Sequence, residues 1–128
     1  MNGMQLGFTL IELVVVIVIL GILSAVALPR FVDLSSQAGR AAAQGVAGSI
    51  SSSTSINYAA RKANHGSAIA ISGCSTATMS TLLAGGLPSG YTFTGGGICT
   101  DGQTTSCTVT NNNVTPPQTA SAVVLCVN

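Results

Sequence analysis

The chain has 128 residues, enough for one domain of ordinary size together with an attached helix. Only 5% of its residues are charged and the formal net charge is +1, which leaves neither a basic surface for nucleic acid nor a surface for acidic substrates. The polar residues are mostly Ser, Thr, Asn and Gln. Because a net charge near zero favours association, this surface is suited to packing against copies of itself.

An apolar run extends from Phe8 to Leu28 and would span about 31 Å as a helix, which is the thickness of a bilayer core. A cleaved secretory signal, a permanent membrane anchor and a buried helix of a soluble protein all have to be considered. The buried helix fits least well, because so much Val, Ile and Leu would dominate a small core. Ordinary signal cleavage stays open because Ala25 to Ala27 form an Ala-x-Ala-like site, although the run is long and lacks a basic start.

The stretch GFTLIEL, which begins at Gly7, precedes this run; Gly21 lies inside the run and Pro29 at its end. This arrangement resembles the N-terminus of type IV pilins and of the related pseudopilins of type II secretion. The continuation LPRFVDLSSQAGRAAAQGVAGSISSS resembles pilins of the mannose-sensitive haemagglutinin type. We therefore expect a pilin-like α+β fold, in which a long N-terminal helix packs on a small antiparallel β-sheet.

The resemblance implies that a prepilin peptidase cuts between Gly7 and Phe8 and methylates the new amine of Phe8. Glycine suits such a cut, since its backbone can approach an active site closely. Residues 1–7 are then a cleaved leader, 8–29 a hydrophobic transmembrane and filament-core helix, and 30–128 a globular pilin domain that includes an amphipathic helix over 30–62. The leader departs from the family pattern, because Gln5 and Leu6 stand where a basic residue is usual.

Glu12 is an isolated acidic residue in the apolar run. A carboxylate at mid-bilayer costs several kcal/mol, but less near the interface. Glu12 follows Phe8 by about one helical turn, where the helix dipole favours an anion by roughly 0.3 to 1 kcal/mol. We expect it to pair with the Phe8 amine of a neighbouring subunit and so to set the register of assembly, because a slip leaves a charge uncompensated. The alternative is a carboxylate that merely lies at the membrane interface.

Gly21 and Pro29 bound a candidate hinge. Proline removes a backbone donor and clashes with the preceding turn, and glycine lowers helix propensity. By resemblance to pilins in filaments, the stretch between them loses helical structure on assembly. A simple kink in a continuous helix is the alternative.

A second helical pattern begins at Phe31 and is expected to end near Lys62. Small or apolar residues at spacings near three and four predict one buried face, made of Leu34, Ala38, Ala42, Gly45, Ser49 and Ile56.

Glycines in this second helix, Gly39, Gly45 and Gly48, each cost about 1 kcal/mol relative to Ala, so close packing is expected to offset them. Gly66 is the expected C-terminal cap of the helix, and His65 belongs to that cap, with no metal or catalytic role expected.

The C-terminal half alternates β-like runs with Gly, Ser, Asn and Pro, which predicts a small antiparallel sheet. A short helix is expected between Met79 and Pro88. Tyr91 and Phe93 share one strand face and should pack in the core. The predicted strands are AIAIS from Ala68, YTFT from Tyr91, CTVT from Cys107 and SAVVLCV from Ser121.

Four cysteines follow an export-type N-terminus and form no CxxC pattern, so we expect disulfides. Of the three pairings we favour Cys99 with Cys107 and Cys74 with Cys126, the latter joining the last strand to the start of the sheet. Zinc binding is the alternative, but no spacing supports it. Asn113-Val-Thr matches a glycosylation acceptor, a pattern that often arises by chance.

The sequence shows no paired carboxylates, no nucleophile with a base, no phosphate loop and no metal cluster. We therefore expect that the protein is not an enzyme and binds no cofactor or metal. We expect the major structural subunit of a type IV pilus, used for adhesion or surface motility. Its partners would be copies of itself in a helical filament, the prepilin peptidase, the pilus assembly machinery and, before assembly, the bacterial inner membrane; no nucleic acid is expected. The alternatives are a type II secretion pseudopilin and a plain signal-anchored membrane protein.

Overall fold

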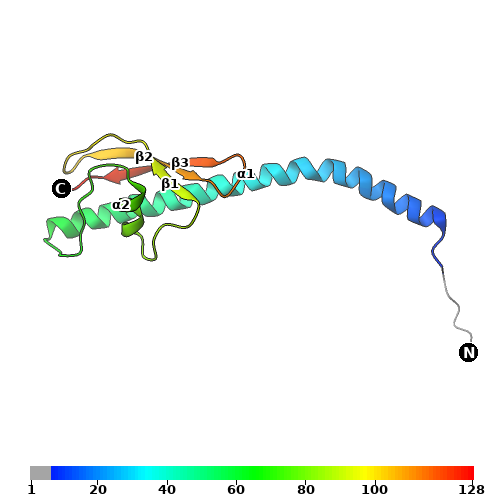
Figure 1. The fold of residues 1–128 in the computed structure, drawn as a ribbon, viewed down its shortest axis with the longest axis horizontal. Coiled ribbons are helices and arrows are strands. Elements are labelled where there is room, and N and C mark those ends of the chain that lie inside the picture. The colour runs from blue at the N-terminus through cyan, green and yellow to red at the C-terminus, as the bar shows by residue number, and fades with distance from the viewer. Residues whose placement is uncertain (1–6) are drawn as a thin grey trace, which may run out of the picture. The chain divides into compact units, whose positions relative to one another are not determined.

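The computed structural model describes residues 7–128, so the predicted leader, apart from Gly7, lies outside the described residues (Figure 1). The chain divides between Leu34 and Ser35 into two compact units, and the first helix passes from one into the other. The described elements are α1 (Leu10–Lys62), α2 (Thr76–Leu82), β1 (Tyr91–Thr94), β2 (Thr104–Asn111) and β3 (Gln118–Leu125).

In the first unit, residues 10–34 form the N-terminal part of α1, which begins at Leu10, two residues after the expected start at Phe8. The helix continues without a break through Gly21 and Pro29. It ends at Lys62, where the sequence pattern predicted.

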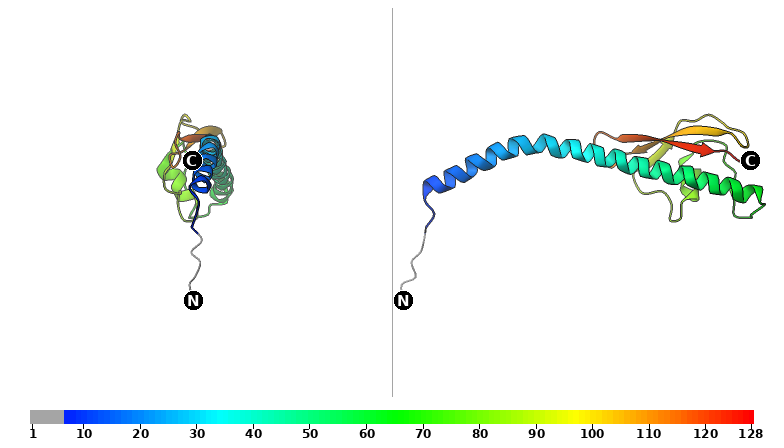
Figure 2. Two further views of the ribbon diagram at one scale, coloured as in Figure 1. Left: turned by 90° about the vertical axis from the view of Figure 1, so that its right-hand side faces the viewer. Right: turned by 180° about the vertical axis from the view of Figure 1, so that it is seen from behind.

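In the second unit, β1, β2 and β3 form an antiparallel sheet in that order, and the C-terminal part of α1 packs on one face of it (Figures 1 and 2). A long helix on a three-stranded antiparallel sheet confirms the predicted α+β fold. Ala47 and Ile50 of α1 belong to one hydrophobic core with the inward side chains of the sheet and α2: Met79, Phe93, Cys107, Val109, Ala122 and Val124.

The prediction of the buried face of the second helical pattern is wrong, because the observed face is shifted by about one residue along the helix. The buried positions are Gly39, Ala43, Ala47, Ile50, Thr54 and Asn57, whereas the predicted positions are exposed. Small residues occur on both faces, so apolar character gave little contrast between them. In addition, Thr54 and Asn57 are buried because the domain satisfies their polar groups. Asn57, for example, accepts from the Ile69 N–H (3.0 Å) and donates to the Ile69 carbonyl (2.8 Å).

Hydroxyl side chains from the helices form hydrogen bonds with backbone groups at both edges of the sheet. On the outer edge of β3, Ser51 Oγ accepts from the Val123 N–H (3.0 Å) and Thr54 Oγ1 from the Leu125 N–H (3.3 Å). On the edge of β1, Thr76 Oγ1 accepts from the Phe93 N–H (3.0 Å) and donates to the Phe93 carbonyl (3.3 Å). The backbone groups bonded in this way, at Val123, Leu125 and Phe93, are not available to another strand.

The strand predictions were partly right. β1 coincides with the predicted YTFT, and β2 and β3 each begin three residues before the predicted starts at Cys107 and Ser121. The run from Ala68 is not a strand and makes one isolated bridge, Ile71 to Val127. The Asn57 side chain bonds both the N–H and the carbonyl of Ile69, so these backbone groups are not available to pair with a strand.

Two helix boundaries also differ from prediction. The short helix lies at Thr76–Leu82 instead of Met79–Pro88, because Gly85 and Gly86 take positive φ values of 95° and 82° that end helical geometry. After α1, Asn64 adopts the left-handed conformation (φ 55°) that was expected at Gly66.

The predicted disulfide pairing is wrong, because the structure joins Cys74 to Cys107 and Cys99 to Cys126, with Cα separations of 5.6 and 6.0 Å. Cys99 precedes β2 and Cys126 follows β3, and antiparallel pairing brings these two ends together. Hydrogen bonds from Gly102 to Cys126 and from Cys126 to Gln103 hold them there. The side chain of Cys107, on β2, points into the core and is bonded there to Cys74.

Candidate functional site

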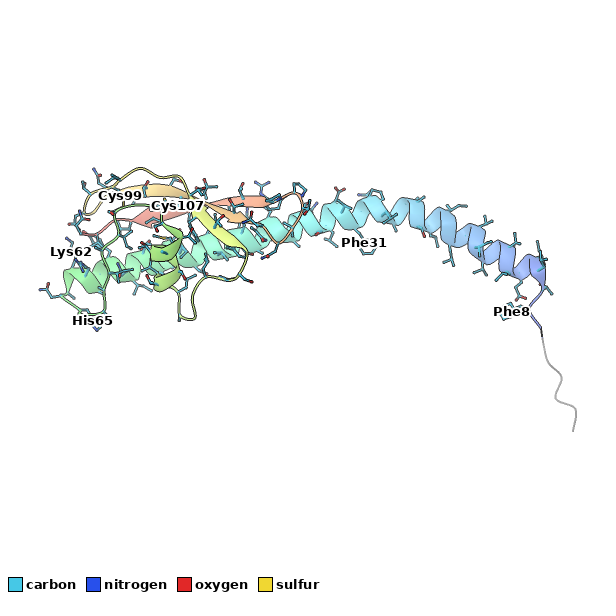
Figure 3. All side chains as sticks on the ribbon, in the orientation of Figure 1. Phe8, Phe31, Lys62, His65, Cys99 and Cys107 are labelled. Carbon is cyan, nitrogen blue, oxygen red and sulfur yellow. A yellow bond between two sulfur atoms is a disulfide. The ribbon has the colours of Figure 1, made fainter. Side chains whose placement is uncertain are left out.

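The first unit presents an apolar helix that its own unit leaves uncovered. In Figure 3, Phe8 and Phe31 project from the ribbon with no side chain packed over them, and they are 83% and 69% exposed. The span is long and apolar enough to cross a membrane, with a mean hydropathy of 3.0 in its most apolar window. So large an apolar surface marks a contact with lipid or with another protein. The other exposed large residues of this unit are Leu10, Ile11, Leu13 to Leu20, Ile22, Leu23, Val26, Leu28, Val32 and Leu34.

The start of α1 places Glu12 beside Thr9. Thr9 Oγ1 accepts from the Glu12 N–H (3.4 Å), and the hydroxyl donates to Glu12 Oε2 (3.5 Å). Thr9 is therefore the N-cap, a role that our sequence reasoning missed although the Thr-x-x-Glu spacing of a capping box was visible. The described residues supply no cation to the exposed Glu12 carboxylate. This leaves the carboxylate accessible to a cation from outside the chain.

Three features weaken α1 between Gly21 and Pro29. Gly21 lowers helix propensity, and no neighbouring atom lies within 4 Å of the position where its Cβ would be. Pro29 lacks the N–H that would bond the carbonyl of Ala25. Between them, the Ser24 hydroxyl donates to the Leu20 carbonyl (2.7 Å), a contact that often bends helices. Gly21 and Pro29 are the predicted ends of the hinge, whereas the contact of Ser24 is seen only in the structure.

Of the three helix glycines, the structure places only Gly39 in close packing within the second unit. A Cβ on Gly39 would lie 2.5 Å from Val114 Cγ2, whereas Gly45 and Gly48 have open space. The expectation of close packing is thus confirmed at one position, and the other two glycines face outward.

Charged side chains of the second unit gather at the end of α1. Lys62 forms an ion pair with Asp101, and their hydrogen bond raises the pKa of Lys62 and lowers that of Asp101. His65, labelled with Lys62 in Figure 3, shares a hydrogen bond with Ser67 Oγ (2.8 Å). An open, polar cavity of about 450 Å³ adjoins Arg61, Lys62 and His65. Within residues 7–128, no group of three His, Cys, Asp or Glu side chains could hold a metal ion.

The N-terminal part of the chain matches a known sequence motif. Residues 2–28 match the family described as the prokaryotic N-terminal methylation motif. This match covers the Gly7–Phe8 bond, the cap formed by Thr9 and Glu12, and most of the uncovered apolar helix.

Among individual proteins, the chain is similar to major subunits of type IV pili. It is 56% identical over 50 residues to the type IV narrow pilus major component PilA5 of Thermus thermophilus, which covers 39% of this chain and 43% of that protein. It is 60% identical over 38 residues to the type IV major pilin protein PilE1 of Neisseria gonorrhoeae, covering 30% of this chain and 23% of that protein. The chain therefore spans less than half the length of these relatives. No solved structure matches it.

Proposed function

We propose that this chain is the major structural subunit of a type IV pilus and polymerises through α1 into an extracellular filament for adhesion or surface motility. The observation that carries the proposal is the methylation motif on an apolar helix that the chain leaves uncovered. The membrane covers this helix before assembly, and neighbouring subunits cover it in the filament. The role is structural, not enzymatic.

Processing by a prepilin peptidase removes residues 1–7 and leaves a methylated Phe8 at the mature N-terminus. Gly7, Phe8 and Thr9 precede the first residue of α1, so the bond to be cut lies in non-helical backbone that a peptidase can bind in extended form. A side chain at Gly7 would meet no other atom of the chain within 4 Å, which indicates an open approach. Residues 8–29 are then the membrane and filament-core helix, and 30–128 the pilin domain.

Assembly pairs the Glu12 carboxylate with the Phe8 amine of a neighbour. Both groups lie at the same end of α1, and both are accessible. In the apolar surroundings of packed helices, each charge favours the register in which it is compensated. The stretch from Gly21 to Pro29 acts as the hinge that lets the helix adjust on entering the filament.

Mass spectrometry of filaments sheared from the cell surface tests this function. The expected result is a chain that begins at N-methylated Phe8 and carries two disulfides. A chain that retains Met1 to Gly7, or one that begins after Ala27, contradicts the proposal and indicates a plain membrane anchor or an ordinary secreted protein. A methylated chain confined to short periplasmic filaments indicates a pseudopilin instead.

The finer assignment, to pilins of the mannose-sensitive haemagglutinin type, rests on the sequence from Leu28 to Ser53. Purified filaments of this type should agglutinate red cells, and free mannose should abolish the effect. Agglutination that mannose does not change argues against this subfamily.

A further inference from the structure

The sheet of the second unit has an outer face made almost entirely of hydroxyl side chains. Alternate residues of each strand point away from the core. We call these residues the hydroxyl face: Thr92 and Thr94 of β1, Thr104, Ser106, Thr108 and Thr110 of β2, and Thr119 and Ser121 of β3. Val123 and Leu125 continue the same side of β3 as aliphatic residues.

Strand register arranges the hydroxyl face as an ordered array. Hydroxyl residues stand opposite one another across the three strands, about 4.8 Å apart, and repeat along each strand at about 6.8 Å. Two complete rows result: Thr92, Thr110 and Thr119, and Thr94, Thr108 and Ser121.

Charge is absent from the hydroxyl face. The charged side chains of the second unit are Arg40, Arg61 and Lys62 on α1, and Asp101 in the loop before β2. A hydroxyl both donates and accepts hydrogen bonds, so a face of hydroxyls is complementary to itself. Ser106 Oγ and Ser121 Oγ, 2.7 Å apart, show such a pair within the face. Two copies of the face can therefore meet without bringing like charges together.

We propose that the hydroxyl face packs against the same face of a second copy in a neighbouring filament and so joins filaments side by side into bundles. This inference rests on the proposed function, which supplies the filament. The face lies on the opposite side of the sheet from α1, so a filament with its helices inside presents the face outward.

The size of the hydroxyl face explains why the contact should be a property of filaments. Three strands at about 4.8 Å spacing and up to about 27 Å long cover roughly 300 to 400 Å². A stable pair of proteins buries about 800 Å² on each partner, so one contact is too small to hold two subunits together. Repetition along two filaments multiplies such weak contacts into a strong one. The face also carries no aromatic ring to stack on a sugar and no charge to hold an ionic surface, which favours a second copy as the partner.

A charge placed at the centre of the hydroxyl face tests this contact. Thr108 lies on the central strand between Thr94 and Ser121, and its side chain is exposed. We expect T108K filaments and T108D filaments to form at normal yield but to stay dispersed. The matched control is S89K, which adds the same charge at an exposed turn outside the face. Low-speed sedimentation measures bundles, high-speed sedimentation measures filaments, and electron microscopy confirms both.

Mixing the two variants gives the sharpest result. If position 108 faces its own copy, T108K and T108D filaments should sediment together at low speed although neither does so alone, and salt should weaken the mixture. Bundles that persist in either single variant, or mixtures that stay dispersed, overturn the proposal. Loss of adherence to cellulose or silica with bundling unchanged assigns the face to a foreign surface instead. Wild-type filaments without methylated Phe8 would instead contradict the proposed function, which separates the two failures.

Discussion

The two parts of α1 differ in what covers them. Before Leu34, the large apolar side chains are exposed, whereas after Ser35 one stripe of the helix is buried under the sheet. The buried stripe consists of Gly, Ala, one Ile and hydrogen-bonded polar residues, while the exposed stretch consists mainly of Val, Ile and Leu. The most apolar part of this chain is therefore the part that other molecules, lipid or protein, must cover. Assembly and domain stability should therefore respond to different substitutions.

Glu12→Gln should have the largest effect, on assembly alone. Gln keeps the size of Glu and can serve in the capping arrangement with Thr9, so α1 should start normally. Insertion should be no worse, because a neutral amide costs less in lipid than an anion. We expect processing at Gly7 to continue and surface filaments, quantified by shearing and immunoblotting, to be lost or strongly reduced. Asp33→Asn is the control and should assemble normally, since an exposed charge contributes little. Normal filament yield from Glu12→Gln would remove the charge from the assembly mechanism.

Removing the Cys74–Cys107 disulfide should have the largest effect on the domain. The bond closes a loop of 33 residues, and replacing both cysteines with Ala should lower the free energy of unfolding by about 2 to 5 kcal/mol. Both tyrosines of the chain, Tyr58 and Tyr91, belong to the second unit, so tyrosine fluorescence during urea unfolding reports on the domain. Digestion without reduction should release a Cys74 peptide joined to a Cys107 peptide. Recovery of Cys99 joined to Cys107 would contradict the structure.

Alanine at Gly39 and at Gly48 should act in opposite directions. At Gly39 the new Cβ meets Val114, and the overpacking cost of about 1 to 3 kcal/mol outweighs the gain of about 0.5 to 1 kcal/mol in helix propensity. At Gly48 the space is open, so the domain should become more stable by about 0.5 to 1 kcal/mol. Urea unfolding of the subunit measures both. A Gly48→Ala variant that is more stable yet assembles poorly would extend the assembly surface beyond Leu34.

The exposed pair of Lys62 and Asp101 should have the smallest effect. The ion pair lowers the pKa of Asp101, so its stabilisation is present above the ordinary value of 3.8 and is lost as pH falls through the lowered pKa. It raises the pKa of Lys62, so the same stabilisation is present below 10.5 and is lost as pH rises through the raised pKa. Asp101→Asn should lower Tm slightly at pH 7, and the difference should vanish in strong acid. A large difference at pH 7 would mean that Asp101 holds its loop by more than this pair.

The fold class and the apolar helix could be predicted from sequence because each depends on local pattern. The run from Phe8 to Leu28 is so apolar that no tertiary contact is needed to assign it, and alternation in YTFT identifies β1. Long-range choices could not be predicted in this way. Cys126 meets Cys99 only because β3 returns beside β2, which spacing along the chain does not record.

The prediction of the buried face of α1 in the second unit was wrong for a different reason. The buried stripe includes Thr54 and Asn57, which look like surface residues in the sequence. They are buried because β3 donates a hydrogen bond to Thr54 and the loop at Ile69 accepts one from Asn57. In a helix where Ala, Gly and Ser lie all round, those bonds decide the face more than hydrophobicity does. The cap at Thr9, by contrast, could have been predicted, because the Thr-x-x-Glu spacing from Thr9 to Glu12 is a local signal of a capping box.

The hydroxyl groups that bond backbone positions at the sheet edges also bear on the state of subunits before assembly. Under the proposed function, subunits accumulate in the membrane with their domains side by side, where an open β-edge would pair with the next domain and start an amyloid-like array. Ser51 and Thr54 occupy the outer backbone of β3, and Thr76 that of β1, so crowded domains find these positions already taken. If the proposed function holds, subunits in the membrane are protected from strand pairing at these positions and remain available for assembly.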